Sequence, residues 1–502
     1  MRRFLKHAAI LAHRWLGVCL ALLFLMWFLS GIVLVFVDHP RLTPAERFAG
    51  LAPIDPVRCC APLPESLAAA RITSVRELRL AMNQGVPVYR VLPDLPGARW
   101  IAIRADTGVP MEAVDGAAAS RIAAGFSGSS ATTLSRFDSD QWTVAQRFDP
   151  FRPLFEVSIN DEHGTTLYIS ETSGDVVLDT HRNERFWNWL GAVPHWIYAK
   201  QLRERPGLWH HVVVWISLPG VLLVLTGIYL GIIRLRRNRT PYREPWLRWH
   251  HVIGLACALF AGTWIFSGLM SMNPFNLYSG RLPDAGEIAA WRGNSVGASP
   301  DVFSDVDFRK ALLAKPDARE ATWTRIGDKN YVIATARPDD SLIVPMWHDD
   351  MRDYLAVATA ETALGRMRPG LTITSLHQMD VHDEYYYARR PDSEGRRLPA
   401  LRAEYSDGTW VYVELPTGLP ALRIDPAGRT RRWLYNGLHS LDTSWLRERP
   451  VVRESLIVIL CIIGAGFSLT GVVLAARVLK CSSRTRFNVS RHDPMRPSIG
   501  PP

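Results

Sequence analysis

The stretch WLGVCLALLFLMWFLSGIVLVFV, from Trp15 to Val37, has 23 residues and no charged side chain. A helix rises about 1.5 Å per residue, so this length is enough to cross a hydrocarbon core of roughly 30 Å. Three more uncharged runs, of 22, 21 and 22 residues, occur at Val212–Ile233, Val252–Met272 and Ser455–Ala476. An apolar content of 48% is ordinary for a soluble protein, but here the apolar residues are concentrated in four runs. The sequence therefore predicts four transmembrane helices.

Basic residues surround these runs unevenly. They occur at Arg2, Arg3, Lys6 and Arg14 before the first run, at Arg234, Arg236, Arg237, Arg239, Arg243 and Arg248 between the second and third, and at Arg477, Lys480, Arg484, Arg486 and Arg491 after the fourth. Short segments rich in Arg and Lys stay in the cytoplasm, so we expect both termini and the middle loop to be cytoplasmic. The net charge of +10 reflects this topology and gives no support to nucleic-acid binding.

The expected domain boundaries follow from these runs. Transmembrane helices are predicted at 8–37, 208–234, 250–272 and 453–477, with a cytoplasmic loop at 235–249 and a cytoplasmic tail at 478–502. The two long segments, 38–207 and 273–452, would then form domains outside the cytoplasm. Alternating apolar residues between Gly-containing turns predict a mixture of strands and helices in them. Their only cysteines, Cys59 and Cys60, are adjacent, so no disulfide framework is expected.

The chain repeats itself at two related spacings. A shift of 244 places the run LRERP at 202–206 on the same run at 446–450, His195 on His439, and the LTG triplet at 225–227 on that at 469–471. A shift of 237 places His13 on His250. We expect two parallel copies of one unit (helix, outside domain, helix) related by a pseudo-twofold axis along the membrane normal. The repeated Thr-Gly pairs are interpreted as positions where small residues let helices approach each other.

Three segments resemble a known family. The HRWLG opening at 13–17, the strand–glycine–strand hairpins of the outside domains and the LHSL segment at 438–441 resemble PepSY-associated transmembrane proteins, which include iron-regulated inner-membrane proteins and siderophore-iron reductases. The resemblance covers nearly the whole chain. It implies the bacterial inner membrane, an α+β PepSY-like periplasmic domain in each repeat, bound haem b and electron transfer to ferric iron on the periplasmic side. The first copy departs from the pattern, because Pro194-His195 stands where the second has Leu438-His439.

The first repeated pair of histidines is His13 and His250, near the cytoplasmic ends of the first and third helices. Each is followed four residues later by a glycine, Gly17 or Gly254. Residues i and i+4 share a helix face, and glycine there leaves room for a flat ring. Neutral imidazole is an axial ligand of haem iron, so the pair predicts a haem site, although histidines at a headgroup boundary remain the alternative. His251 points about 100° away, where it would compete with His250 or support it.

The second repeated pair is His195 and His439, just before the second and fourth helices. A haem on the outer side could take both of them, or one of them with His210 or His211 at the start of the second helix. The sequence leaves these pairings open, together with the alternative of histidines hydrogen-bonded to lipid headgroups. Two haem levels would together carry an electron across the bilayer.

Taken with the histidine pairs, the family resemblance implies a transmembrane protein with two haem b groups that passes electrons outward to a ferric siderophore or another ferric chelate. No flavin or dinucleotide motif is present in the sequence, so the electrons would come from quinol or from a cytoplasmic donor on the basic loop. No residue is assigned a catalytic role. The alternative is a cofactor-free module whose outside domains bind peptides or peptidases, or assist a transporter.

Overall fold

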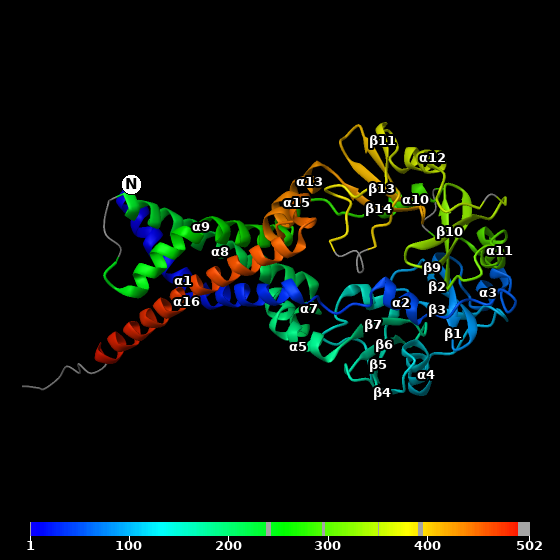
Figure 1. Cartoon of the computed structure of the whole chain (residues 1–502), viewed down its shortest axis with the longest axis horizontal. Coiled ribbons are helices and arrows are strands. Elements are labelled where there is room, and N and C mark those ends of the chain that lie inside the picture. Colours follow the sequence, from blue (N-terminus) through cyan, green and yellow to red (C-terminus); the bar gives the residue numbers. More distant parts are fainter. Residues whose placement is uncertain (1, 237–241, 294–296, 350, 390–394, 490–502) are drawn as a thin grey trace, which may run out of the picture. The chain divides into compact units, whose positions relative to one another are not determined.

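The computed structural model describes residues 2–236, 242–293, 297–349, 351–389 and 395–489 (Figure 1). It divides the chain into two compact units. The membrane unit comprises Met1–Asp38, Trp187–Pro274 and Leu434–Pro502, and the globular unit comprises His39–Phe186 and Phe275–Trp433. Parts of the predicted loop at 235–249 and tail at 478–502 lie outside the described residues.

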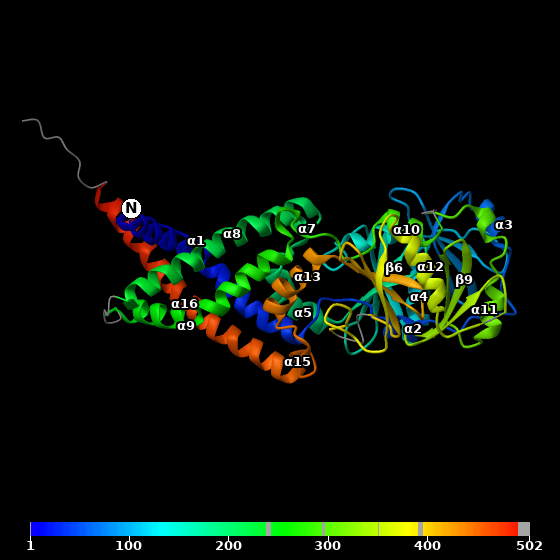
Figure 2. The same ribbon diagram turned by 90° about the horizontal axis from the view of Figure 1, so that it is seen from above.

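Four long helices form the membrane unit, namely α1 (Arg2–Phe36), α8 (Pro206–Arg236), α9 (Pro245–Ser271) and α16 (Pro450–Val489). Each contains a stretch long and apolar enough to cross a membrane, so the chain is a multi-pass membrane protein. The helices pack in a ring, in the order α1, α16, α9, α8 and back to α1. Figure 2 shows the four long helices from the side. A buried cluster including Phe24, Phe28, Ile265 and Cys461 fills the centre of this ring.

Short helices precede two of the long ones. Before α8 lie α5 (Arg182–Leu190), α6 (Ala192–His195) and α7 (Lys200–Arg203). Before α16 lie α13 (Pro426–Arg432), the π-helical turn η4 (Trp433–Gly437), α14 (Leu438–Ser440) and α15 (Ser444–Arg447). The α6 and α14 helices each contact a long helix, α6 with α1 and α14 with α9. These contacts hold two of the predicted histidines against the bundle.

The largest sheet of the globular unit has six antiparallel strands in the order β10-β9-β8-β1-β2-β3. The strands are β1 (Val75–Asn83), β2 (Val86–Pro93), β3 (Ile101–Arg104), β8 (Glu320–Ile326), β9 (Lys329–Arg337) and β10 (Asp340–Pro345). The central pair joins β1 to β8, with Leu80 opposite Ala321. Strands from both long segments of the chain therefore share one sheet.

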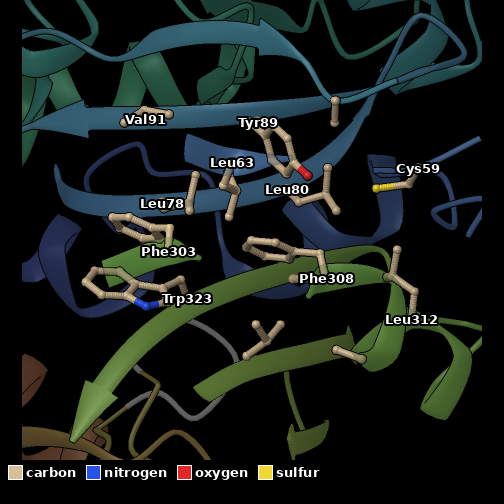
Figure 3. Close-up of a cluster of buried hydrophobic side chains, with 14 of the residues drawn as sticks. Cys59, Leu63, Leu78, Leu80, Tyr89, Val91, Phe303, Phe308, Leu312 and Trp323 are labelled. Atoms are coloured by element: carbon tan, nitrogen blue, oxygen red, sulfur yellow. The ribbon is translucent and has the colours of Figure 1, made fainter. Parts of the chain in front are cut away.

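One face of this sheet carries the core shown in Figure 3, where Leu78, Leu80, Tyr89, Phe308 and Trp323 come together. Burying one such side chain fully contributes roughly 1.5–3 kcal/mol, so the shared core strongly favours keeping the two halves joined. The short helices of these halves are α2 (Pro44–Gly50), α3 (Leu63–Ala69), α10 (Ala285–Trp291), α11 (Phe308–Ala314), η2 (Pro274–Asn276) and η3 (Pro300–Phe303). Cys59 and Cys60 form a disulfide, which ties no distant segments together.

Two four-stranded meanders complete the globular unit. One has β4 (Ala131–Phe137), β5 (Leu154–Ile159), β6 (Thr166–Ser170) and β7 (Val176–Thr180), with α4 (Gly116–Ser127) packed on it and η1 (Gln146–Phe151) in a connection. The other has β11 (Ile373–Met379), β12 (Ala400–Tyr405), β13 (Trp410–Glu414) and β14 (Leu419–Ile424), with α12 (Val357–Met367). Gly174 and Gly418 turn their last hairpins at φ +65° and +63°, conformations that favour glycine.

A buried ionic cluster lies where β1 meets β8. Arg79 is 3.2 Å from the Asp175 carboxylate and 3.6 Å from that of Glu320, and Arg90 is 2.9 Å from Asp175. Arg47 also pairs with Glu320. Burial opposes ionisation of Glu320, but the neighbouring guanidinium groups dominate and lower its pKa to about 2. The cluster thus keeps Glu320 charged within the shared sheet.

Candidate functional site

The first histidine pair lies inside the ring of long helices. His13 on α1 and His250 on α9 have ring centroids 6.2 Å apart, with the ring planes tilted by 53°. Two imidazoles that bind one metal ion from opposite sides, each at about 2 Å, have their centroids about 6 Å apart. The spacing of this pair therefore matches two axial ligands of a single iron.

The Nδ1 atom of each ring has a defined hydrogen-bond partner. His13 Nδ1 donates to the carbonyl of Leu223 at 3.1 Å. His250 Nδ1 lies 2.9 Å from Thr470 Oγ1, and the Thr470 hydroxyl itself donates to the carbonyl of Phe467 at 2.6 Å. The Thr470 oxygen must then accept from the imidazole. Both rings thus carry their proton on Nδ1 and a lone pair on Nε2, the arrangement typical of metal-binding histidine.

A cavity of about 240 Å³ adjoins this pair, and Gly17 and Gly254, singled out in the sequence, line it. Two further glycines lie closer to the rings. A Cβ on Gly227 would be 2.9 Å from His13 Cε1, and one on Gly471 would be 3.6 Å from His250 Cε1. A side chain at Gly227 would therefore displace the His13 ring, whereas a Cβ at Gly471 would only touch the His250 ring.

The second pair repeats the same geometry. His195 on α6 and His439 on α14 have ring centroids 6.2 Å apart, with an angle of 67° between the planes. Their Nδ1 atoms lie 3.1 and 3.0 Å from the hydroxyl oxygens of Ser30 and Ser267. Both serine hydroxyls donate to carbonyls of their own helices, so they accept from the imidazoles. Burial lowers the pKa of His195 to about 3, which keeps this ring neutral and able to bind a metal.

Tryptophans anchor the segments that carry the second pair. Trp27 Nε1 donates to the carbonyl of His195 at 3.0 Å, and Trp264 Nε1 donates to that of Leu438 at 3.1 Å. These bonds hold α6 against α1 and α14 against α9. In the second copy the bonded carbonyl, that of Leu438, lies one residue before His439, the counterpart of His195. This offset accompanies the π-helical turn η4, which occurs just before α14.

The two pairs lie at opposite ends of the bundle. Ser30, which contacts His195, follows His13 by 17 residues on α1, and Ser267 follows His250 by 17 residues on α9. At the rise of an α-helix this is a separation of about 25 Å along each helix. Such a spacing places one pair near each face of a membrane.

The remaining histidine candidates have other neighbours. His251 lines the cavity, and its ring centroid is 6.0 Å from that of Tyr242. His210 and His211 lie beside each other at the start of α8, with centroids 5.5 Å apart. The structure brings His195 together with His439, and so favours this pairing over the two that include His210 or His211.

Four hydroxyl residues contact the histidines but had no such role in the sequence analysis: Ser30, Thr226, Ser267 and Thr470. The Thr226 hydroxyl lies 3.4 Å from His13 Nδ1. Each hydroxyl residue is followed by a glycine that also faces a histidine, since Gly31 and Gly268 would place a Cβ 3.5 and 3.7 Å from the Cε1 atoms of His195 and His439. The repeated Ser-Gly and Thr-Gly pairs were the available signal, because the hydroxyl can accept the imidazole proton and the glycine lies beside the same ring.

Comparison with known proteins places the chain in a family. No curated protein matches it significantly. The family model described as the PepSY-associated TM region matches residues 10–477, which is nearly the whole chain. The protein therefore belongs to the PepSY-associated transmembrane family.

Proposed function

We propose that this protein is a transmembrane electron carrier that holds two haem b groups and reduces ferric iron. The observation that carries the proposal is the repeated pair of histidines. Both pairs have a centroid spacing of 6.2 Å, and both rings of each pair direct Nδ1 to an oxygen acceptor. Two unrelated boundary histidines would have no reason to share this geometry at both ends of one bundle.

The residues present fit haem b. His13 and His250 would hold one iron, and His195 and His439 the other, because neutral imidazole is a standard axial ligand. When bound, haem supplies a carrier that takes up and releases one electron. The protein fixes the tautomer of each ligand and, through the apolar cluster around Phe28, keeps water out of the space between the two pairs.

The proposed arrangement includes two parallel repeats in the bacterial inner membrane. The Arg and Lys asymmetry supports cytoplasmic termini and a cytoplasmic 235–249 loop. The globular unit is then periplasmic, His13 and His250 lie toward the cytoplasm, and His195 and His439 lie toward the periplasm. Threonines at equivalent positions lie beside His13 and His250, and serines at equivalent positions lie beside His195 and His439, which supports the duplication.

The proposed substrate is ferric iron in a siderophore or another chelate, met on the periplasmic side. One electron converts ferric to ferrous iron, which hard oxygen ligands hold less strongly, so the iron is released. The electron donor is quinol or a cytoplasmic protein, because the sequence contains no flavin-binding or nicotinamide-binding motif.

An optical spectrum of the purified protein tests the cofactor. Protein expressed with sufficient haem should show the sharp reduced α-band of low-spin haem with two imidazole ligands. His13→Ala and His250→Ala should lose the inner haem, whereas His377→Ala, an exposed residue of the globular unit, should keep both. A folded wild-type protein without colour would refute the haem assignment.

Reoxidation of the reduced protein tests the substrate. Protein reduced with dithionite and freed of excess reductant should be reoxidised by a ferric hydroxamate siderophore, with ferrous iron trapped by a chelator. His439→Ala should slow this step more than it slows reduction of the inner haem. If no ferric chelate reoxidises the reduced wild-type protein but quinone does, the proposed direction of electron flow is wrong.

A further inference from the structure

The cavity beside His13 and His250 extends toward the end of α8 and the start of α9. Leu230, Leu255 and Ala258 give this part apolar walls, while Tyr242 and His251 also line it. Tyr242 lies just before α9, and His251 lies in its second turn. An apolar cavity with polar groups at one end suits a ligand that is itself apolar with a polar edge.

Arg234 lies against Tyr242, one of the residues that line this polar end. Its guanidinium carbon lies 3.7 Å from the centroid of the Tyr242 ring, and the Tyr242 ring lies 6.0 Å from that of His251. Arg234 is also close enough to His251 to act on it electrostatically. A guanidinium, a phenol and an imidazole together offer donors and positive charge, the combination that binds a carboxylate.

The position of this group along α8 matches the proposed haem site. Gly227 faces His13, and Arg234 follows Gly227 by seven residues, which is two helical turns or about 10 Å. Haem is a flat apolar ring with two carboxylates on one edge. Its ring suits the apolar walls, whereas its carboxylates need donors and a counter-charge if they are not to be buried at a large cost.

We propose that Arg234, Tyr242 and His251 bind the carboxylate groups of the inner haem. This inference rests on the proposed function and adds the residues that fix which edge of the haem faces this end of the cavity. Once the carboxylates are held, the ring cannot rotate about the line between its two histidines.

The second repeat supplies a matched control instead of a second copy of this group. A shift of 244 places Val478 at the position of Arg234, and a shift of 237 places Leu5 at that of Tyr242. The nearest arginine on α16 is Arg477, which pairs with Glu244. Arg477 is thus the same residue type near the corresponding end of a helix, and it pairs with Glu244.

The test titrates the haem-depleted full-length protein with haem and with haem dimethyl ester, in which both carboxylates are blocked. Loss of a charge-assisted hydrogen bond costs roughly 1.5–3 kcal/mol, so Arg234→Gln should weaken haem binding by about 10- to 100-fold. The variant should bind the ester as the wild type does. Tyr242→Phe should show a smaller loss of the same kind, Arg234→Lys should recover part of the affinity, and Arg477→Gln should change neither ligand.

The outcomes separate the competing explanations. Equal losses for haem and its ester in Arg234→Gln would mean that the residue only supports the fold, which overturns the inference. Unchanged haem affinity together with lost stabilisation by anionic phospholipid would assign the group to a lipid headgroup, and so also overturn it. A folded wild-type protein that binds neither haem nor the ester would instead refute the proposed function itself.

Discussion

Replacing Thr470 with valine should weaken binding of the proposed inner haem, because Thr470 Oγ1 is the acceptor, at 2.9 Å, for His250 Nδ1. Valine has nearly the same shape, so the ring keeps its packing while its proton loses its partner. A buried donor left unsatisfied costs roughly 1–3 kcal/mol, and loss of such a supporting bond typically lowers metal affinity 10- to 100-fold. We therefore expect haem affinity at the inner site to fall by about that factor.

The matched control is Thr226→Val in the first repeat. Thr226 lies farther from His13 Nδ1, at 3.4 Å, and that nitrogen already donates to the Leu223 carbonyl at 3.1 Å. This change should cost less than about 1 kcal/mol, since the proton of His13 keeps its main acceptor.

Haem titration followed by the reduced α-band measures both variants, and a redox titration gives a second readout. A hydrogen bond from Nδ1 makes the ligand nitrogen more basic and favours ferric iron, so Thr470→Val should also raise the midpoint potential. Equal haem affinities for Thr470→Val and wild type, or a larger loss in Thr226→Val, would refute the assigned role of the hydroxyl.

Three other predictions test different parts of the chain. Gly227→Val should displace the His13 ring, which a Cβ would approach to 2.9 Å, and should lower haem content measured by absorbance while the helical circular dichroism stays unchanged. The Glu320 carboxylate, whose pKa is lowered from 4.5 to about 2, should contribute about 3 kcal/mol above pH 4.5 and lose it as the pH falls through 2. The difference in thermal unfolding between wild type and Glu320→Gln should therefore shrink on acidification, and a constant difference would contradict the assignment. Reporter fusions after Arg243 and after Pro300 should give opposite compartment signals, and identical signals would overturn the proposed topology.

The four membrane helices could be predicted because the signal is local. A run of about 20 apolar residues identifies a transmembrane helix whatever the rest of the chain does. The partners of the strands could not be predicted in this way, since β1 and β8 pair across about 240 residues. The two outside segments were expected to form separate domains, whereas backbone pairing of β1 with β8 joins them in one sheet.

The candidate site was predicted in part. Duplication drew attention to His13 with His250 and to His195 with His439, and the structure brings each pair together. The hydroxyl partners were missed because a serine or threonine beside a glycine in a membrane helix is also typical of close helix packing. Their second role depends on which side chain faces them from another helix.

The sequence by itself determined that the chain crosses a membrane four times, which end of each helix is basic and which histidines recur. These properties depend on composition and spacing along the chain, so they can be read without knowing any contact. Only the tertiary structure decided that His195 faces His439 instead of His210 or His211, that Ser30 and Thr470 accept imidazole protons, and that both long segments share a sheet. Those features depend on distances between residues far apart in sequence, and packing alone sets such distances.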